Sequence, residues 1–249
     1  MSNPMSKRYF RTGAAAASVL LCALGLRAAV PGPVRVLVVT GGHDYPTSFY
    51  TLFDEPETIQ WDHAASNHEA FKSDLRGQYD VLVLYDMSTE ISEAERKNLT
   101  DFLGSGKGMV VLHHAILDYP DWDEWWREVV GGKYLTKPEG GLPASSYLHD
   151  QEVLAVPAAP HPLLAGIGRL RLNDETYKGM WISPKVTVLL KTDNPTSDPA
   201  VAWVSPYEKS RVVYIQLGHG ELAHRNPGYR RLVRNAILWS AGRLGEGGK

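Results

Sequence analysis

Histidines recur at one kind of position in this sequence, directly after apolar segments that we expect to form buried strands. Ligands of open parallel sheets bind beyond the carboxyl ends of the strands, so the residues that follow each apolar segment are the first candidates for chemistry. Such residues occur at Gly41-Gly42-His43-Asp44, Tyr85-Asp86, His113-His114 and Gly218-His219-Gly220-Glu221. The glycines beside His43 and His219 permit sharp turns and a close approach of the backbone, as the floor of a site requires.

Two or three neutral imidazoles with a carboxylate can bind a divalent metal ion, or can act as general acid and base. The predicted metal ligands are His43, His113 and His219, with Glu175 or Asp86 adding a carboxylate, and this set suits zinc or manganese. Without a metal, His113 and Glu175 are the natural acid and base, and His43 is a further catalytic candidate. The remaining interpretation is structural, with these imidazoles bonded to loop backbone. No short metal-binding motif decides among the three.

The segments that must position these residues alternate between apolar runs and amphipathic stretches, which is typical of a parallel sheet covered on both faces. Strands are expected at residues 34–39, 58–61, 81–85, 109–112, 186–190, 200–204 and 212–217. Helices are expected at 66–76, from a capping box of Ser92 and Glu95 to Gly104, from Asp121 to 130, and at 227–241. After 131, prolines interrupt the chain as far as 162, and we expect only edge strands and loops there.

The first 29 residues have the pattern of a secretory signal peptide. They carry Lys7, Arg8, Arg11 and Arg27 without any acidic residue, and they enclose a 12-residue run of small and apolar residues from Gly13 to Leu24. Ser6 to Phe10 resembles a twin-arginine export signal with lysine in place of the first arginine. We therefore expect an exported protein, periplasmic or extracellular, with an uncleaved membrane anchor as the alternative, and one α/β domain over 30–249.

The single cysteine, Cys22, lies inside this leader, so residues 30–249 contain no thiol. Thiol catalysis and cysteine-based zinc sites are thereby excluded from that part of the chain. Removal of the leader takes away basic residues only and moves the formal net charge from −2 to −6. A chain with 26 basic and 28 acidic residues presents no basic surface for nucleic acid, which we exclude as a partner.

Five ordered motifs across the chain resemble those of the trehalose-utilisation (ThuA-like) family. They are Gly41-Gly42-His43-Asp44-Tyr45, Leu112-His113-His114-Ala115 with Tyr119-Pro120-Asp121-Trp122, His161-Pro162-Leu163 to Gly166, Asp174-Glu175-Thr176-Tyr177, and Gly218-His219. The resemblance implies a class I glutamine amidotransferase-like, flavodoxin-related α/β fold and a role in the bacterial use of trehalose and related glycosides, including 3-keto sugars. Where the amidotransferase relatives carry a nucleophilic cysteine, this chain has the His113 turn, so glutamine hydrolysis by that mechanism is excluded.

A small carbohydrate is the expected ligand, and the candidates for contact with it are Asp44, Tyr45, Asp86, His114, Tyr119, Trp125 and Tyr177. Trp122 and Trp126 share a helical face with Val129 and are expected in the core, which leaves Trp125 as the better sugar platform. His114 is equally suited to a supporting hydrogen bond behind His113. The expected activity is that of a hydrolase, isomerase or lyase on a glycoside or keto sugar, and the alternative is a non-catalytic sugar-binding module. The sequence leaves the oligomeric state open.

Overall fold

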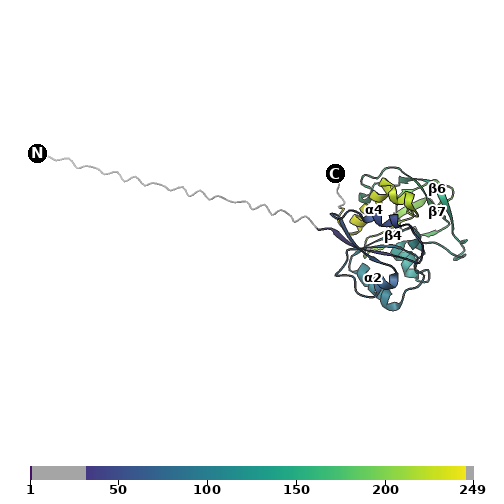
Figure 1. Ribbon diagram of the computed structural model, residues 1–249, viewed down its shortest axis with the longest axis horizontal. Helices are drawn as coiled ribbons and strands as arrows, with labels where there is room; N and C mark the ends of the chain where they lie inside the picture. The colour runs from purple at the N-terminus through teal and green to yellow at the C-terminus, as the bar shows by residue number, and fades with distance from the viewer. Residues whose placement is uncertain (2–31, 245–249) are drawn as a thin grey trace. The chain divides into compact units, whose positions relative to one another are not determined.

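Five parallel strands form one half of a nine-stranded sheet in the computed structural model, which describes Met1 and residues 32–244 (Figure 1). Their spatial order is β2-β1-β3-β4-β11, which is the flavodoxin-like order with its switch point between β1 and β3. Their bounds are β1 (Val34–Gly41), β2 (Ile59–Ala64), β3 (Val81–Asp86), β4 (Gly108–Leu112) and β11 (Val212–Ile215). Because these strands are parallel, the histidine-bearing segments that follow β1, β4 and β11 leave the sheet at the same end.

The other half of the sheet is antiparallel and continues in the order β10-β9-β6-β7. These strands are β10 (Ala200–Val204), β9 (Thr187–Lys191), β6 (Ser146–Pro157) and β7 (Leu170–Lys178). A separate pair consists of β5 (Gly132–Lys133) and β8 (Trp181–Ile182). The proline-rich stretch thus contains longer strands than we expected, because its prolines lie outside β6 and β7 or, as Pro157, at a strand end.

Helices cover both faces of the sheet, and Figure 1 shows α4 and α2 on opposite sides of it. The α-helices are α1 (Asn67–Phe71), α2 (Glu93–Gly104), α3 (Glu221–Arg225) and α4 (Pro227–Ser240). Shorter 3₁₀ and π elements are η1 (Thr47–Phe53), η2 (His113–Leu117), η3 (Trp125–Val130) and η4 (Pro162–Leu164). The capping box of Ser92 and Glu95 is present at the start of α2.

Helix α1 is shorter than the segment 66–76 that we expected. Ser66 caps it as expected, accepting a hydrogen bond from the Glu69 backbone N–H. The Asp74 carboxylate accepts a hydrogen bond from the Arg76 backbone N–H at 3.0 Å, and this local turn replaces a continuing helix.

Successive side chains of the buried strands pack alternately into two apolar cores, one on each face of the sheet. In β4, Val110 and Leu112 pack into the core under α4, whereas Met109 and Val111 pack into the core under α2. This alternation on a strand buried on both faces explains why β4 is a continuous apolar run in the sequence.

The predicted leader, residues 1–29, lies outside the described residues except for Met1. Within the described part of the chain, no helix combines the length and the hydropathy that crossing a membrane requires.

A buried pair of acidic residues joins the end of β3 to the end of η2, beside the histidine turn. Ser88 binds both carboxyl groups, through its hydroxyl to Asp86 Oδ2 at 2.6 Å and through its backbone N–H to Asp118 Oδ1 at 2.7 Å. Burial raises the pKa of Asp86 to about 6, and burial together with the charge of Asp86 raises the pKa of Asp118 well above its usual value. Their remaining oxygens, Asp86 Oδ1 and Asp118 Oδ2, are buried without a hydrogen-bond partner among the described residues. The raised pKa values mean that the folded state retains a proton that the unfolded chain releases.

Replacing Asp118→Asn should flatten the pH dependence of stability between pH 4 and 6. A retained proton stabilises the fold at low pH, and its contribution falls by about 1.4 kcal/mol per pH unit as pH rises toward the folded pKa. Asparagine is neutral at every pH and takes up no charge when buried, so the variant should gain stability relative to the native chain as pH rises. Urea unfolding at pH 4, 5 and 6 measures this difference, with the exposed Asp193→Asn as control. Parallel curves for the native chain and Asp118→Asn would contradict the retained proton.

Candidate functional site

His113 lies on a strained turn directly after the central strand β4. Its φ is +52°, which a non-glycine residue rarely adopts, and its side chain is buried. Strain of this kind persists where the surrounding structure holds a side chain in a required direction. Here the direction is fixed by His113 Nδ1, which lies 2.6 Å from the backbone oxygen of Gln216. Because a carbonyl only accepts, Nδ1 carries a proton, and in the neutral ring the Nε2 atom is an acceptor.

Three side chains converge on that Nε2 atom. The Nδ1 atom of His219 is 3.1 Å away, the hydroxyl of Tyr177 is 3.0 Å away, and the Oε1 atom of Glu175 is 3.5 Å away. The other carboxylate oxygen of Glu175 lies 3.6 Å from His219 Nδ1. Among the residues that the structure describes, His113, Glu175 and His219 are the group of three ligand-type side chains whose donor atoms all lie within 4.8 Å of one another.

The buried carboxylate of Asp174 holds two of these side chains in place. It accepts hydrogen bonds from the backbone N–H groups of Gly218, His219 and Glu175, at 2.8, 2.9 and 3.0 Å. Gly218 has a φ of +120°, and a Cβ atom there would lie 2.0 Å from the Tyr229 hydroxyl, so only glycine fits this turn. Burial raises the pKa of Asp174, although the charge of His113 and these hydrogen bonds oppose the rise.

The surroundings favour the deprotonated forms of Glu175 and His219. Burial opposes ionisation of Glu175, but its contacts with His113, His219 and Tyr177 lower the pKa of Glu175 below its usual value. Burial and the charge of His113 lower the pKa of His219. A carboxylate and a neutral imidazole are the forms that bind a metal ion.

His149 also contacts this group, although the sequence gave no reason to select it. Its Nδ1 atom lies 2.8 Å from Glu175 Oε2, and its ring lies 4.9 Å from the ring of His219. It occupies β6 opposite Glu175, so its position depends on the register of β6 against β7. The pattern of a strand in the proline-rich stretch was the one signal that could have found it.

His43 and His114 form a second pair of rings beside the first group. Their rings stack with centroids 4.4 Å apart, and His43 meets the ring of His219 edge-on at 6.2 Å. Burial and the charges of His113 and His43 lower the pKa of His114 to about 2, so its ring is neutral. Its Nε2 atom bonds to the backbone oxygen of Tyr85 at 3.1 Å. His114 therefore has the supporting hydrogen bond considered from the sequence.

A cavity of about 280 Å³ opens beside these residues. Its walls combine aromatic, apolar and ionisable side chains, namely His43, Met87, His114, Leu117, Tyr134, Tyr147, His149, Glu175 and Tyr177. Glu175 connects the two features, since it lines the cavity and contacts both His113 and His219. Such a mainly apolar pocket with a few convergent polar groups is typical of small-molecule sites.

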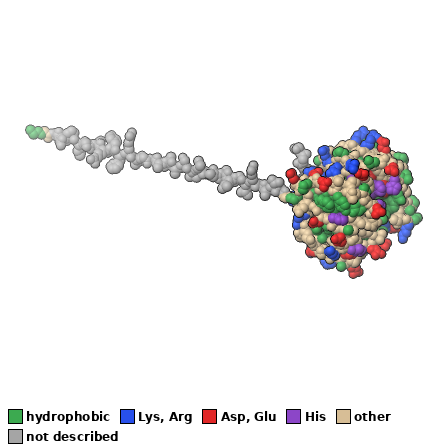
Figure 2. All heavy atoms as spheres, in the orientation of Figure 1, with side chains coloured by type: hydrophobic (Ala, Val, Ile, Leu, Met, Phe, Trp, Pro, Cys, Tyr) green, Lys and Arg blue, Asp and Glu red, His purple; other side chains and the backbone are tan. Residues whose placement is uncertain are grey.

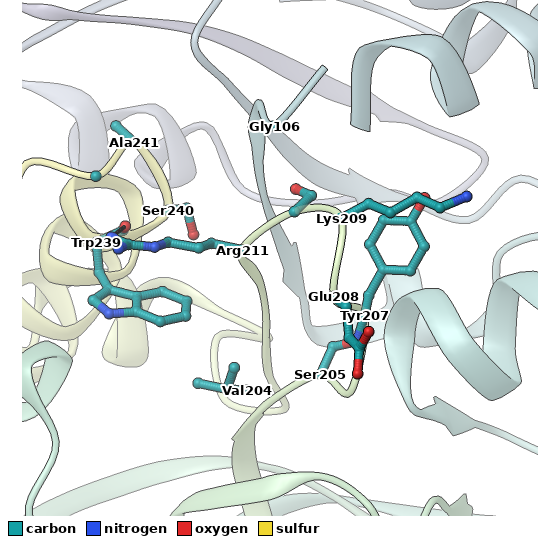
Figure 3. A pocket seen from close by; sticks show the side chains of 12 residues that line it. Gly106, Val204, Ser205, Tyr207, Glu208, Lys209, Arg211, Trp239, Ser240 and Ala241 are labelled. Carbon is teal, nitrogen blue, oxygen red and sulfur yellow. Dashed lines mark hydrogen bonds between the residues drawn. The ribbon is translucent and has the colours of Figure 1, made fainter. Parts of the chain in front are cut away.

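A second cavity, of about 380 Å³, lies at the opposite end of the parallel strands, where β4 and β11 begin (Figure 3). Arg211 and Trp239 lie on one side of it, and Tyr207 and Lys209 on the other. The Arg211 guanidinium is engaged, because it donates to the Trp239 backbone oxygen at 2.9 Å and lies over the Trp239 ring.

Exposed histidines appear at more than one place in Figure 2, so exposure alone does not identify the functional site. The contacts of His113 with His219, Tyr177 and Glu175 identify it.

A family model described as trehalose utilisation, ThuA, matches residues 35–240. The chain belongs to the ThuA family. The fold of a ThuA-like protein from Parabacteroides merdae is similar, with a TM-score of 0.70 at 17% identity, over 86% of this chain and 92% of that one. A ThuA-like protein from Bacteroides uniformis gives a TM-score of 0.66 at 19% identity, over 90% and 98% of the two chains. The resemblance and the flavodoxin-like fold expected from the motifs are confirmed.

More distant likenesses show the fold alone. A beta-galactosidase from Rahnella sp. R3 matches with a TM-score of 0.56 at 15% identity, over 86% of this ThuA chain but 32% of the galactosidase. A comparison with curated proteins finds no match.

Several predicted contact residues of this ThuA chain lie away from the cavity. Trp125 is 1% exposed in the core under α2, where its ring stacks on Trp122 and meets Tyr119, which is also buried. Neither Trp125 nor Tyr119 offers a free ring face to a sugar, so the expected platform is not where we predicted it. Trp122 and Trp126 are in this core, as expected.

Three polar candidates are also engaged elsewhere. Asp86 forms the buried pair with Asp118, so Glu175 and not Asp86 is the carboxylate beside His113. The Tyr45 hydroxyl bonds to Thr40 and Tyr50, at 2.9 and 2.7 Å. Asp44 is exposed, and its backbone oxygen lies 2.5 Å from His43 Nδ1. By contrast His43, His114, Glu175 and Tyr177 do line the cavity.

Asp174→Asn should destabilise this ThuA chain by about 1–3 kcal/mol. Both carboxylate oxygens accept backbone N–H groups, and an amide NH₂ in place of one of them leaves a buried donor facing a donor. Thermal or urea unfolding measures the loss, with the exposed neighbour Asn173→Asp as control. An Asp174→Asn variant as stable as the native chain would show that these hydrogen bonds are dispensable.

Proposed function

We propose that this ThuA protein acts on a carbohydrate or an oxidised sugar at a divalent-ion site formed by His113, Glu175 and His219. The observation that carries the proposal is that one donor atom from each residue lies within 4.8 Å of the other two; His113 Nε2 is 3.1 Å from His219 Nδ1 and 3.5 Å from Glu175 Oε1, and Glu175 Oε2 is 3.6 Å from His219 Nδ1. Ligands arranged tetrahedrally about zinc, each about 2.0–2.1 Å from it, lie about 3.4 Å from one another.

The surroundings of these ligands support a metal role. His113 donates its other ring N–H to the Gln216 carbonyl, as metal-binding histidines do to fix their orientation. The Glu175 carboxylate accepts a contact from His149, which restrains it in the same way. Two imidazoles and one carboxylate suit zinc, and manganese is the alternative. His43 lies beyond this group of donors and serves in the proposal as a wall of the cavity.

The chemistry that a bound ion supplies here is polarisation of a sugar carbonyl or hydroxyl oxygen. Glu175 lies between the cavity and the two histidines, so a sugar in the cavity meets the carboxylate and the Tyr177 ring. Proton transfer beside a carbonyl, or to an activated water, then gives an isomerase, a lyase or a hydrolase. The trehalose-utilisation description of the family supports a carbohydrate substrate. The positive, acid-free N-terminal segment supports action outside the cytoplasm.

Metal analysis tests the ion site directly. The purified native chain should bind about one equivalent of zinc or manganese, and His113→Ala, His219→Ala and Glu175→Gln should each weaken that binding by at least about tenfold. Isothermal titration with each ion measures the affinity. His68→Ala, an exposed histidine away from the cavity, is the matched control. Failure of the native chain to bind either ion would sink the metal part of the proposal.

Product analysis with keto and unmodified disaccharides tests the enzymatic part. His113→Ala should lower turnover by about 10²–10⁴-fold, because it removes a group next to the reacting oxygen, while sugar binding in the cavity persists. Sugar binding without turnover in the native chain, at any tested ion concentration, would instead identify a non-catalytic binding module.

A further inference from the structure

Tyr147 stands out among the exposed side chains of the described residues. It is 54% exposed and belongs to a small set of exposed large hydrophobic residues with Met1, Leu142, Leu148 and Leu222. Tyr147 is the member of this set that lines the cavity beside Glu175. Its neighbour Leu148 is equally exposed, at 50%, but does not line the cavity.

The register of β6 against β7 puts Tyr147 and His149 on the cavity side of the hairpin. Tyr147 pairs with Tyr177, and both side chains line the cavity. Between Leu148 and Gln151 the register shifts, so two residues of β6, His149 and Asp150, lie opposite the single residue Glu175. This is a β-bulge, a device that redirects a strand or a side chain.

The bulge costs conformational energy, and such a cost is typical of a functional site. Asp150 has a φ of +57°, a conformation that costs on the order of 1 kcal/mol or more for a non-glycine residue. Tyr147 is 54% exposed, and its ring meets the ring of His149 edge-on, with centroids 5.3 Å apart. Strain and exposed aromatic surface side by side at a cavity mouth are typical of a binding site.

The cavity is small for the ligand that the family description names. Pockets that enclose a drug-sized ligand span about 300–1,000 Å³, and this one has about 280 Å³. A volume of this size is of the order of one sugar ring, so the second ring of a disaccharide would lie outside its mouth. Tyr147 is the exposed aromatic side chain at that position.

We infer that Tyr147 is the platform for the second ring of a two-ring sugar whose first ring occupies the cavity beside Glu175. The inference rests on the proposed function, because it takes the cavity as a sugar site. The apolar C–H face of a pyranose ring packs on a flat aromatic ring, and an exposed tyrosine provides this surface with little loss of side-chain entropy. Tyr147 thereby selects disaccharides over monosaccharides.

Binding of trehalose and of glucose to the full chain tests the inference. Isothermal titration should show that Tyr147→Ala weakens trehalose binding about 3- to 10-fold and leaves glucose binding unchanged. Tyr147→Phe keeps the ring and should bind trehalose within about twofold of the native chain. Leu148→Ala, the matched control with a similarly exposed side chain off the cavity, should bind both sugars as the native chain does.

Three other outcomes of these binding measurements would contradict the role of Tyr147. Equal trehalose binding by the native chain and Tyr147→Ala, or equal losses for both sugars, refutes the platform while leaving the sugar site intact. Binding of neither sugar by the native chain refutes the platform for unmodified disaccharides, and turnover of neither keto nor unmodified disaccharides in the product analysis refutes the proposed function. A native dimer that Tyr147→Ala or Leu148→Ala dissociates in sedimentation would assign this surface to a second copy of the chain and refute the platform.

Discussion

The candidate site depends on one buried carboxylate, that of Asp174. Asp174 lies on β7, the outermost strand of the antiparallel half, whereas Gly218 and His219 follow β11, the last strand of the parallel half. Its hydrogen bonds from the backbone N–H groups of Gly218 and His219 join these distant parts of the sheet, so the loop after β11 lies against β7. Because Glu175 is the next residue on that strand, the same contact places the carboxylate beside both histidines.

The parallel half supplies the remaining geometry. Strand β4 delivers His113 at the carboxyl end of the sheet, and the backbone of Gln216, which follows β11, orients its ring. This hydrogen bond engages the proton on His113 Nδ1, and the Nε2 atom therefore faces Glu175 and His219. A central strand followed by a strained turn thus presents an imidazole at the carboxyl end of the sheet.

The parallel strands and the histidines at their ends could be predicted because each depends on local sequence. Continuous apolar runs identify buried parallel strands, and the residue after such a run must lie at the sheet end, so His43, His113 and His219 were selected together. His149 was not selected from the sequence, because its place opposite Glu175 depends on the pairing of β6 with β7 and on a bulge that local sequence does not mark. Trp125 and Asp86 were selected by chemical type, but tertiary packing gave them neighbours in the core and in a buried acid pair.

The extra residue in β6 separates the part of the strand that lines the cavity from the part that packs into the core. Before the bulge, the odd-numbered Tyr147 and His149 face the cavity, and after it the odd-numbered Val153 and Ala155 are buried in the core. In an unbroken strand these four side chains would share one face with each other and with Glu175 and Tyr177. Chain length between Leu148 and Val153 is therefore under tighter constraint than the identity of the residues there. Loss or gain of a single residue in this segment would exchange the ligand-facing and the core-facing surfaces of the hairpin, whereas most substitutions within it would not.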